Sequence, residues 1–452
     1  MKKFLNALVF SSLIALIYAL TYLIPDWVGW GGLSSSFIFF ILRLTLSLLW
    51  LLGITYHHLW DQQNVKTIRT RLLFLLCFFT AFILTWSIHT TYSLTALYHK
   101  TKQPTRGWRG RVHEYDSELG FKPIPNARGF HTFPVGPEIP MMYDKNGFRV
   151  PLSYDHDQNS QKHPRILFLG CSFTYGDACY AEETFPFLVE KELNGYTINA
   201  GVCSYGSSQM FLLAKKLIPE YKPDVVVFQN SPWLVERALS CYGPVYQSIL
   251  PTPYFDSDNN LIYPLFKSNA FNYPLDYYRQ SKASWDDYFS FMKIAMIHSM
   301  GDDYRKYSNN VKQFFHLIPK ANKDEDEVQQ FVFSQVNDIC KKNNCRLVTL
   351  DITLPKYKKG IFSPAASENI PRINADSALK AHLSVNETYE KKYYHYRISG
   401  TDSVMVDPHP NVIAHRIIAD EIVRVIRSLQ PAGDSTGIHK DVMNMPMSDT
   451  IK

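Results

Sequence analysis

The sequence has little net charge and no recognisable metal-binding pattern. Over 452 residues, 47 Lys and Arg stand against 41 Asp and Glu, which gives a formal charge of +6. No Lys/Arg stripe is interleaved with aromatic residues, so the composition gives no case for nucleic-acid binding. Seven cysteines are present, but no CxxC pair or histidine-rich partner set accompanies them, which argues against metal ligation. We therefore expect no cofactor and no metal, and we find no internal repeat.

A cleavable signal peptide is also missing, although the first hundred residues contain long apolar runs. Three apolar segments cover 4–24, 33–55 and 72–98, and the first is about long enough to cross a bilayer. A cleaved signal has a shorter apolar core and a small-residue cleavage site, neither of which is clear in 4–24. The sequence thus predicts three retained transmembrane helices. Arg43, inside the second, is expected to face a polar partner, to anchor a lipid head group, or to snorkel or pack against a neighbouring helix.

The basic residues that flank these segments are used to predict orientation. Five of them favour a cytoplasmic N-terminus and five favour the opposite orientation, so we let the residues before the first helix decide. Long domains also translocate with little regard to charge. We therefore expect a multi-pass protein of the bacterial inner membrane, with the membrane as a partner and the soluble domain in the periplasm. The two sets of basic residues are Lys2, Lys3, Lys66, Arg69 and Arg71 on one side, and Lys100, Lys102, Arg106, Arg109 and Arg111 on the other.

The cysteines fit an oxidising compartment. Cys77 lies in the third apolar segment, and the other six, an even number, lie in the soluble part. Cys340 and Cys345 are close in sequence and form a candidate bridge.

After Pro164 the chain alternates between strand and helix patterns. The run PDVVVFQN at 223–230 has a continuous apolar core, as in a parallel strand that is covered on both faces. Such alternation predicts an α/β fold with a doubly wound parallel sheet and flanking helices. The expected strands are 165–170, 196–201, 223–230, 345–353 and one within 402–411, and the expected helices are 183–193, 206–220, 326–342 and 412–429.

Three stretches fall outside this alternation. Residues 99–164 form a linker and preamble with Gly, Pro and Asn at turn-like positions. Within the domain at 165–430, the stretch 231–325 is too long for a structureless loop and reads as an aromatic-rich insertion. Its aromatic side chains either stack on sugar rings, hold a lipid chain or, for most of them, form the core of a small subdomain. The polar tail at 431–452 is expected to be disordered.

Polar residues follow the expected strands, where such a sheet places its site. A serine hydroxyl needs a base to become a nucleophile, and Ser172 follows the first strand. His409 titrates near neutral pH and can serve as that base. Asp407 can fix the tautomer of His409 and stabilise the imidazolium. These three residues are the expected catalytic set, against the alternative of a turn serine and a loop histidine.

Acyl transfer also needs donors aimed at the oxyanion of its tetrahedral intermediate. The backbone N–H groups of Ser172 and Gly206 and the side-chain amide of Asn230 are the expected donors. Gly206 alone would be a turn glycine, and Asn230 alone would be a capping or structural residue.

The motifs around these residues resemble those of the SGNH/GDSL hydrolases, and in particular the membrane-tethered bacterial type. The stretch GCSFTYG at 170–176 resembles the first block, and NAGVCSYGSSQ resembles the second, with Gly206 in the oxyanion role. VVVFQNSPW is similar to the third block, with Asn230 as its asparagine, and DPHPN resembles the fifth, with Asp407 and His409. The preamble motifs YDSELGFKPIPN and NGFR look like those that precede the tethered members.

This chain departs from the family pattern at three places. Cys171 stands where an aspartate usually precedes the nucleophile; it is a rival nucleophile, although a small buried thiol is the expected role. Ser231 and Pro232 follow Asn230, whereas the third block of the family usually reads Gly-x-Asn-Asp. Asp407 and His409 are two positions apart, a spacing that also occurs in the family.

The resemblance implies a serine esterase that removes an acyl group through an acyl-serine intermediate. The expected substrate is an acylated glycan or lipid of the cell envelope, with acetyl as the example. Two alternatives stay open, namely an O-acyltransferase that uses the same three residues on a polysaccharide, and a non-catalytic assembly or glycan-binding protein on a hydrolase-like scaffold.

Overall fold

The centre of the molecule is a five-stranded sheet in which all neighbouring strands are parallel. A computed structural model describes residues 2–27, 37–59, 76–88, 107–153, 161–245, 248–265, 308–355, 357, 360–365 and 368–429. From edge to edge the sheet runs β8 (Tyr196–Asn199), β7 (Arg165–Leu169), β9 (Val225–Asn230), β14 (Arg346–Asp351) and β15 (Arg372–Asn374). Numbered along the chain this order is 2-1-3-4-5, so the connections change direction between β7 and β9.

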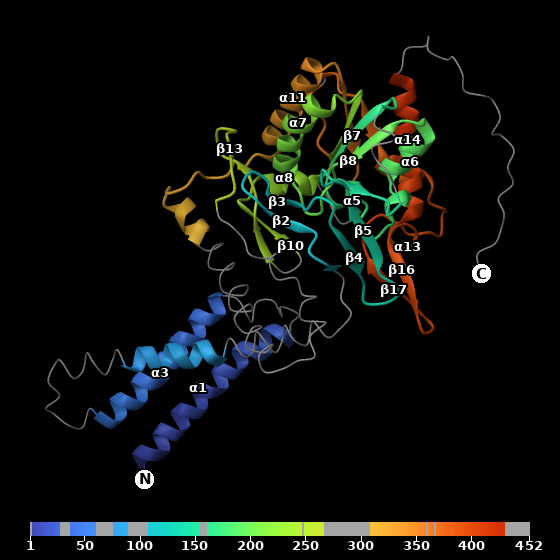
Figure 1. Cartoon of the computed structure of the whole chain (residues 1–452). Helices are drawn as coiled ribbons and strands as arrows, with labels where there is room; N and C mark the ends of the chain where they lie inside the picture. The colour runs from blue at the N-terminus through green and yellow to red at the C-terminus, as the bar shows by residue number, and fades with distance from the viewer. Residues whose placement is uncertain are drawn as a thin grey trace.

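Helices cover both faces of the sheet, which explains why its central strands are buried. All six residues of β9 are buried, as are four of the five in β7. Figure 1 shows α7 and α11 on one side of the sheet and α6 and α14 on the other. The prediction of a doubly wound parallel sheet is confirmed by this topology. The four helices are α6 (Phe185–Leu193), α7 (Ser207–Tyr221), α11 (Glu325–Lys342) and α14 (Val412–Leu429).

The last expected strand forms, but it does not join the sheet. β17 (Asp402–Asp407) pairs antiparallel with β16 (His395–Ser399) in a separate hairpin. The first four residues of β17 are exposed, whereas a strand of this parallel sheet is buried on both faces. Arg397 in the hairpin donates to the carbonyl oxygens of Val135 (2.9 Å) and Pro137 (2.5 Å) in the preamble. The hairpin is thereby tied to the preamble and brings the end of β17 to the sheet.

The preamble is a small antiparallel structure. Four of its strands form one sheet in the order β1-β4-β5-β6, and two form a hairpin. Figure 1 shows β4 and β5 beside α5. The strands are β1 (Gly107–Arg109), β2 (His113–Asp116), β3 (Gly120–Pro123), β4 (Arg128–Thr132), β5 (Ile139–Tyr143) and β6 (Arg149–Val150).

The remaining elements are short. Part of the expected insertion is described, and there Trp233 and Phe255 are buried in the main core rather than in the core of a separate small subdomain. Residues 266–307, which include Trp285, and the tail at 431–452 lie outside the described residues. The short elements are α5 (Ser172–Tyr175), η2 (Ala181–Glu183), α8 (Pro232–Ala238), β10 (Tyr242–Val245), β11 (Ser248–Pro251), β12 (Tyr254–Phe255), β13 (Leu261–Ile262), α12 (Ala375–Ala381) and α13 (Tyr389–Tyr393), with further helical segments at 76–88 and 308–314.

The N-terminal helices correct the prediction of a membrane region. α1 (Lys2–Trp27) and α3 (Phe37–Leu59) contain most of the first two expected spans, and only 76–88 of the third is described. None of the helices in the described part of the chain is long and apolar enough to cross a membrane. This finding contradicts the predicted three transmembrane helices and inner-membrane location, and it leaves the membrane-anchored type without support. Arg43 on α3 faces a polar partner on α1, because its Nε donates to Thr21 Oγ1 (2.8 Å).

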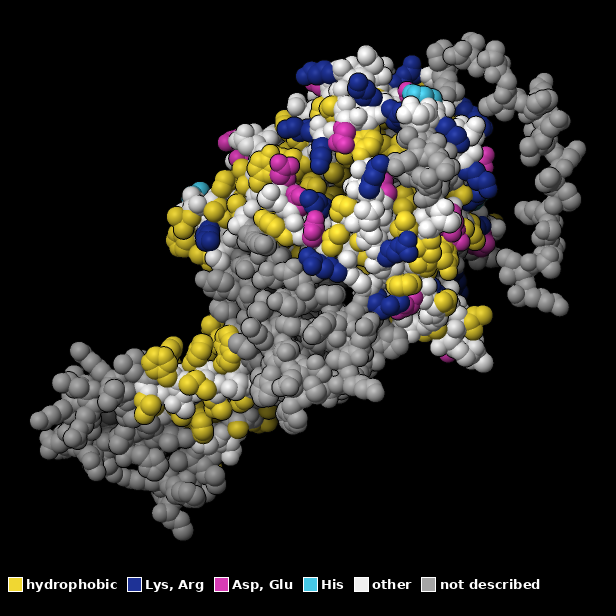
Figure 2. All heavy atoms as spheres, viewed as in Figure 1, with side chains coloured by type: hydrophobic (Ala, Val, Ile, Leu, Met, Phe, Trp, Pro, Cys, Tyr) yellow, Lys and Arg dark blue, Asp and Glu magenta, His cyan; other side chains and the backbone are white. Residues whose placement is uncertain are grey.

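The cysteines and the surface charges relate to two expectations, namely a candidate Cys340–Cys345 bridge and the distribution of Lys and Arg. All seven cysteines are free and buried, so Cys340 and Cys345 are not bridged in this structure. On the face shown in Figure 2, Lys and Arg are interspersed with Asp and Glu over the described part of the α/β body, without a continuous basic stripe.

A buried histidine between α14 and α6 makes stability depend on pH. Burial lowers the pKa of His415 to about 3, and its Nδ1 accepts the N–H of Phe185 (3.2 Å). Between pH 6.5 and 3 the unfolded chain binds a proton that the folded chain does not, so stability falls as the pH falls. We expect the free energy of unfolding to fall between pH 7 and pH 5 by about 2 kcal/mol less in His415→Gln, which keeps an acceptor, than in the parent protein. Urea unfolding at the two pH values measures this difference. Equal losses in both proteins would contradict this role of burial.

Candidate active site

The candidate nucleophile lies in a tight turn between β7 and α5. Gly170 starts the turn, and a Cβ there would lie 2.0 Å from Thr174 Oγ1, so only glycine fits. The side-chain oxygen Oε1 of Gln229 accepts from Thr174 Oγ1 (2.9 Å) and from the backbone N–H of Cys171 (3.0 Å). These bonds hold Ser172 at the first residue of α5, with 8% of its surface exposed.

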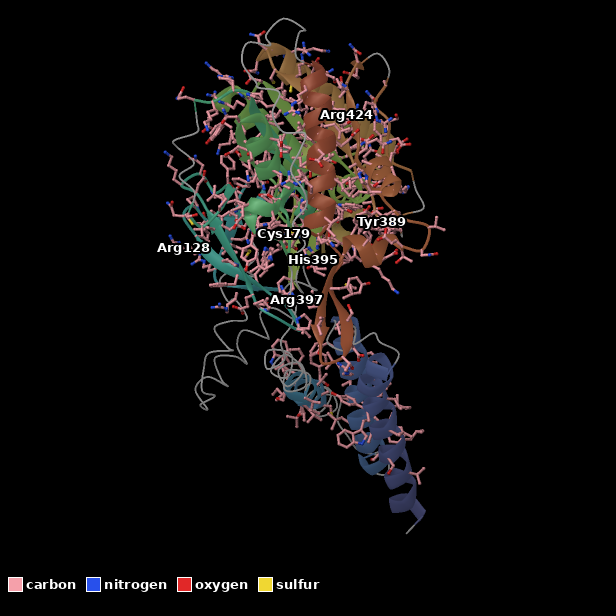
Figure 3. The ribbon with its side chains drawn as sticks, turned by 90° about the vertical axis from the view of Figure 1, so that its right-hand side faces the viewer. Arg128, Cys179, Tyr389, His395, Arg397 and Arg424 are labelled. Carbon is pink, nitrogen blue, oxygen red and sulfur yellow. The ribbon has the colours of Figure 1, made fainter. Side chains whose placement is uncertain are left out.

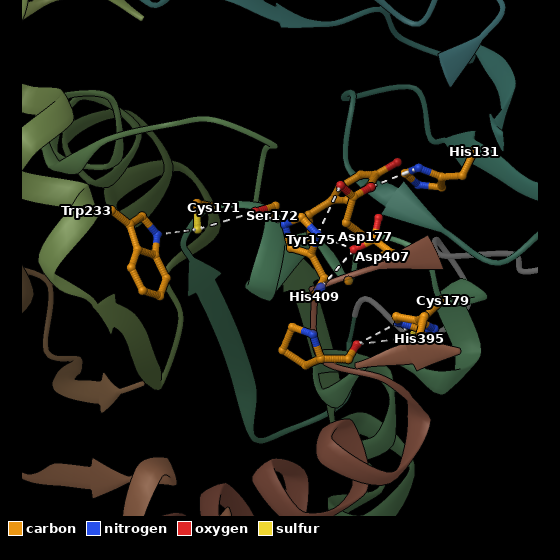
Figure 4. Close-up of polar contacts among 12 residues, drawn as sticks. His131, Cys171, Ser172, Tyr175, Asp177, Cys179, Trp233, His395, Asp407 and His409 are labelled. Atoms are coloured by element: carbon orange, nitrogen blue, oxygen red, sulfur yellow. Dashed lines mark hydrogen bonds and ion pairs between the residues drawn. The ribbon is translucent and has the colours of Figure 1, made fainter. Parts of the chain in front are cut away.

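Ser172, His409 and Asp407 form one chain of hydrogen bonds. Ser172 Oγ lies 2.8 Å from His409 Nε2, and His409 Nδ1 lies 2.6 Å from Asp407 Oδ1 (Figure 4). Asp407 Oδ1 also accepts the backbone N–H of His409 (2.8 Å). A carboxylate at Nδ1 keeps the proton on that nitrogen and leaves Nε2 free to accept the serine proton. The structure thus brings together residues that lie 237 positions apart.

The loop that carries His409 is fixed from both sides. Asn411 Oδ1 accepts the N–H of Ala414 (3.1 Å), which caps the start of α14. The carbonyl oxygen of Pro410 lies 3.1 Å from His395 Nε2 and 3.6 Å from Cys179 Sγ. Figure 3 shows Cys179 and His395 next to one another. Burial lowers the pKa of His395, so a neutral ring donates to Pro410 at neutral pH.

Two of the three expected oxyanion donors are bonded elsewhere. The N–H of Gly206 donates to Gln209 Oε1 (2.9 Å) at the start of α7. Asn230 Nδ2 donates to Asp351 Oδ1 (2.7 Å) and to the carbonyl oxygen of Phe362 (2.8 Å). The reason is register, because Asn230 and Asp351 are directly paired at the ends of β9 and β14. In this structure both groups bond within the scaffold, and their assignment as oxyanion donors stays a prediction.

The N–H of Ser172 is the remaining expected donor. It belongs to the first residue of α5, where helical N–H groups have no intrahelical acceptor. It therefore suits an anion that forms on the nucleophile itself.

A substitution at Asn230 distinguishes a scaffold role from an oxyanion role. We expect Asn230→Ala to lower the free energy of unfolding by about 1–3 kcal/mol, because it removes two buried hydrogen bonds. We expect kcat on a chromogenic ester to change by less than about tenfold. Urea unfolding and steady-state kinetics check both statements. A loss of about 100-fold or more in kcat with unchanged stability would support the oxyanion assignment.

The thiol of Cys171 is a hydrogen-bond acceptor in the wall of the turn. Its Sγ lies 3.3 Å from both Gln229 Nε2 and Trp233 Nε1, which donate to it. The hydroxyl of Ser172 lies 3.8 Å from the same sulfur. Cys171 is fully buried, which fits the expected small buried thiol better than a nucleophile.

Sequence reasoning missed the residues that hold the turn after α5. Arg149 is buried, and its guanidinium donates to the carbonyl oxygens of Tyr175 (2.8 Å), Gly176 (2.5 Å) and Cys179 (2.5 Å). Arg149 ends NGFR in the preamble, but no spacing rule connects that motif to the turn. The other missed residues, all near the triad, are His131, Asp177 and His395.

One group of side chains has the composition of a metal site. Ligand atoms of Asp177, Asp407 and His409 lie within 4.8 Å of one another. His409 Nδ1 and Asp407 Oδ1 are 2.6 Å apart, whereas two ligands of one ion with bonds of about 2.0 Å lie about 3 Å apart or more. This pair therefore fits a shared proton better than a metal.

Comparisons with known proteins find similarity only among solved structures. No family model matches the chain, and no curated protein does. The similar structures include a GDSL-like lipase from Bacteroides thetaiotaomicron VPI-5482, at 12% identity and a TM-score of 0.26 over 59% of this chain and 88% of that one. The psychrotrophic esterase EstA from a Pseudoalteromonas species aligns at 14% identity and a TM-score of 0.28, over 59% and 97%. A carbohydrate esterase family 2 enzyme from Corynascus aligns at 12% and 0.27, over 66% and 72%. At such low TM-scores and identities, the matches establish neither the family nor the activity of this chain.

Proposed function

We propose that the protein is a serine esterase that hydrolyses an acyl ester through an acyl-Ser172 intermediate. The observation that supports this most is the hydrogen-bonded chain from Ser172 Oγ through His409 to Asp407. A serine, an imidazole and a carboxylate in this order are the parts that nucleophilic acyl transfer requires.

Each step of the proposed reaction uses a defined atom. His409 Nε2 takes the proton from Ser172 Oγ while Oγ attacks the ester carbonyl carbon. The oxyanion that forms accepts a hydrogen bond from the N–H of Ser172. The imidazolium then gives its proton to the leaving alkoxide, and the acyl-serine remains. Water, activated by His409, repeats the attack and releases the acid and the free serine, while Asp407 stays ionised throughout.

The side chains next to the nucleophile favour an uncharged acyl group. Phe173 packs against the His409 ring (5.4 Å between centroids) and against Trp233 (5.1 Å), and Trp233 packs against Tyr357 (5.0 Å). These uncharged rings pack behind Ser172 and His409. Our finer proposal is that the substrate is a neutral ester, such as an acetylated glycan or an acylated lipid.

An ester series with product analysis tests the proposal. The full chain is incubated with p-nitrophenyl acetate, butyrate and octanoate, with and without a glycan acceptor, and the products are separated. Hydrolysis predicts free carboxylic acid in stoichiometric amount with p-nitrophenol. Acylated sugar in place of free acid would replace the esterase by a transferase, and no turnover of any ester by folded protein would contradict an esterase.

A further inference from the structure

A second carboxylate faces the candidate base. Asp177 Oδ2 lies 3.8 Å from His409 Nδ1, the same ring nitrogen that bonds to Asp407. The Asp177 side chain is only 2% exposed. The proposed mechanism needs one carboxylate at this nitrogen, so the second has no role in it so far.

The position of Asp177 is fixed relative to the nucleophile. The backbone N–H groups of Gly176 (2.9 Å) and Asp177 (3.0 Å) both donate to the carbonyl oxygen of Ser172. Gly176 turns the chain with φ of 81°, and a Cβ there would lie 2.1 Å from Thr184 Cγ2. Arg149 holds the carbonyl oxygens on either side of Asp177. A displacement of Asp177 would therefore also displace Ser172.

A histidine from the preamble holds the far side of this carboxylate. His131 Nδ1, on β4, lies 2.8 Å from Asp177 Oδ1, and both side chains are buried (Figure 4). Burial lowers the pKa of His131 despite the carboxylate, so the ring is neutral at neutral pH. Its Nε2 has no hydrogen-bond partner among the described residues, which agrees with a single proton on Nδ1. A neutral His131 ring with its proton on Nδ1 therefore faces the carboxylate of Asp177.

We propose that Asp177, held by His131, is a positioning residue that adds a second negative charge beside His409 and stabilises the imidazolium formed when Ser172 attacks. The proposal rests on the proposed esterase function. The proton still moves from Ser172 Oγ to His409 Nε2 and on to the leaving oxygen, and both carboxylates stay ionised. The preamble sheet then contributes to catalysis through the side chains that it places behind the turn.

The other charged and titratable groups around His409 leave this effect in place. Burial keeps His395 and His415 neutral at neutral pH by lowering their pKa, and keeps the Cys179 thiol neutral by raising its pKa. Arg149 is a cation near His409, and its guanidinium is bonded to three carbonyl oxygens. The groups concerned are Asp407 on β17, Asp177 and Cys179 after α5, His395 on β16, His415 on α14, His131 on β4 and Arg149 on β6.

The pH profile of serine labelling tests the proposal without a known substrate. The second-order rate of labelling of the full chain by a fluorophosphonate is measured from pH 4 to 9 for the parent protein and Asp177→Asn. Loss of a nearby negative charge disfavours the imidazolium. We expect the midpoint of the rise in rate to move to lower pH by about one unit or more, and the plateau rate to fall about tenfold or more. The matched control is Asp338→Asn, an exposed aspartate on α11, which should leave midpoint and rate unchanged.

A second variant keeps the test decisive if Asp177→Asn does not fold. His131→Phe keeps a ring to pack against Tyr175 but removes the Nδ1 atom that lies 2.8 Å from Asp177 Oδ1. We expect it to change the rate in the same direction by a smaller factor. An unchanged midpoint and plateau in whichever of the two variants is folded would overturn the proposal. If the Ser172→Ala variant is labelled as fast as the parent protein, the esterase function itself is overturned. The two failures are therefore distinguishable.

Discussion

Ser172→Ala is expected to lower kcat on p-nitrophenyl acetate by at least about 10⁴-fold and to leave the fold intact. The change removes the hydroxyl oxygen that lies 2.8 Å from His409 Nε2, so no acyl-serine can form. The side chain is small, and among the described residues its hydroxyl bonds only to His409 and Cys171, so we expect the midpoint of thermal unfolding to change little. Stopped and steady-state assays on the purified full chain measure the loss.

The matched controls for this variant are another serine and the neighbouring thiol. Ser428→Ala on α14 removes a hydroxyl bonded to the carbonyl oxygen of Val425 and should keep full activity. Cys171→Ala should keep turnover within about tenfold, because its sulfur only accepts hydrogen bonds in the wall of the turn. Activity that survives Ser172→Ala but is lost in Cys171→Ala would make the thiol the nucleophile.

Asp407→Asn is expected to lower kcat by about 10⁴-fold with little change in KM. The amide group can donate to His409 Nδ1 and thereby shift the ring proton to Nε2, where it blocks acceptance of the serine proton. The carboxylate also stabilises the imidazolium, and the amide does not. Measurement of kcat and KM between pH 5 and 9 checks the prediction.

Asp402→Asn is the control for the second prediction. It removes an aspartate charge from the same strand, β17, at an exposed position near the far end of the hairpin. We expect its kcat to equal that of the parent protein. An Asp407→Asn variant that keeps more than a tenth of the parent kcat would show that Asp407 does not orient the base, and Asp177 would then be the first alternative to test.

The order of the first four sheet strands and their helices was predictable because β7, β8, β9 and β14 are almost entirely buried runs. The edge strand β15 was missed, because it is only three residues long and exposes Arg372 and Asn374. That order placed Ser172 after β7, and the structure brings His409 to within 2.8 Å of it. The exclusion of β17 from the sheet was not predictable, because a short exposed strand and a sheet strand carry similar β-forming residues. Its approach to the sheet depends on contacts of Arg397 with the preamble, which no local pattern records.

The oxyanion assignments show what residue types alone leave undecided. A motif can supply Asn230, but the direction of its amide is set by the side chain paired with it on β14. Gly206 likewise has its N–H bonded by the side chain of Gln209, three positions further on. The Asp177–His131 pair was beyond sequence reasoning for another reason. It joins the turn after α5 to β4 of the preamble, and only the docking of the two sheets brings them together.

The most direct test of the proposed function is a map of where a fluorophosphonate reacts. The folded full chain is treated with the reagent at neutral pH, digested, and analysed by mass spectrometry. The proposed triad predicts a single adduct, on Ser172, that forms in stoichiometric amount and is absent in His409→Ala. An adduct on another residue, or no adduct on folded protein, would contradict the assignment of Ser172 as an activated nucleophile.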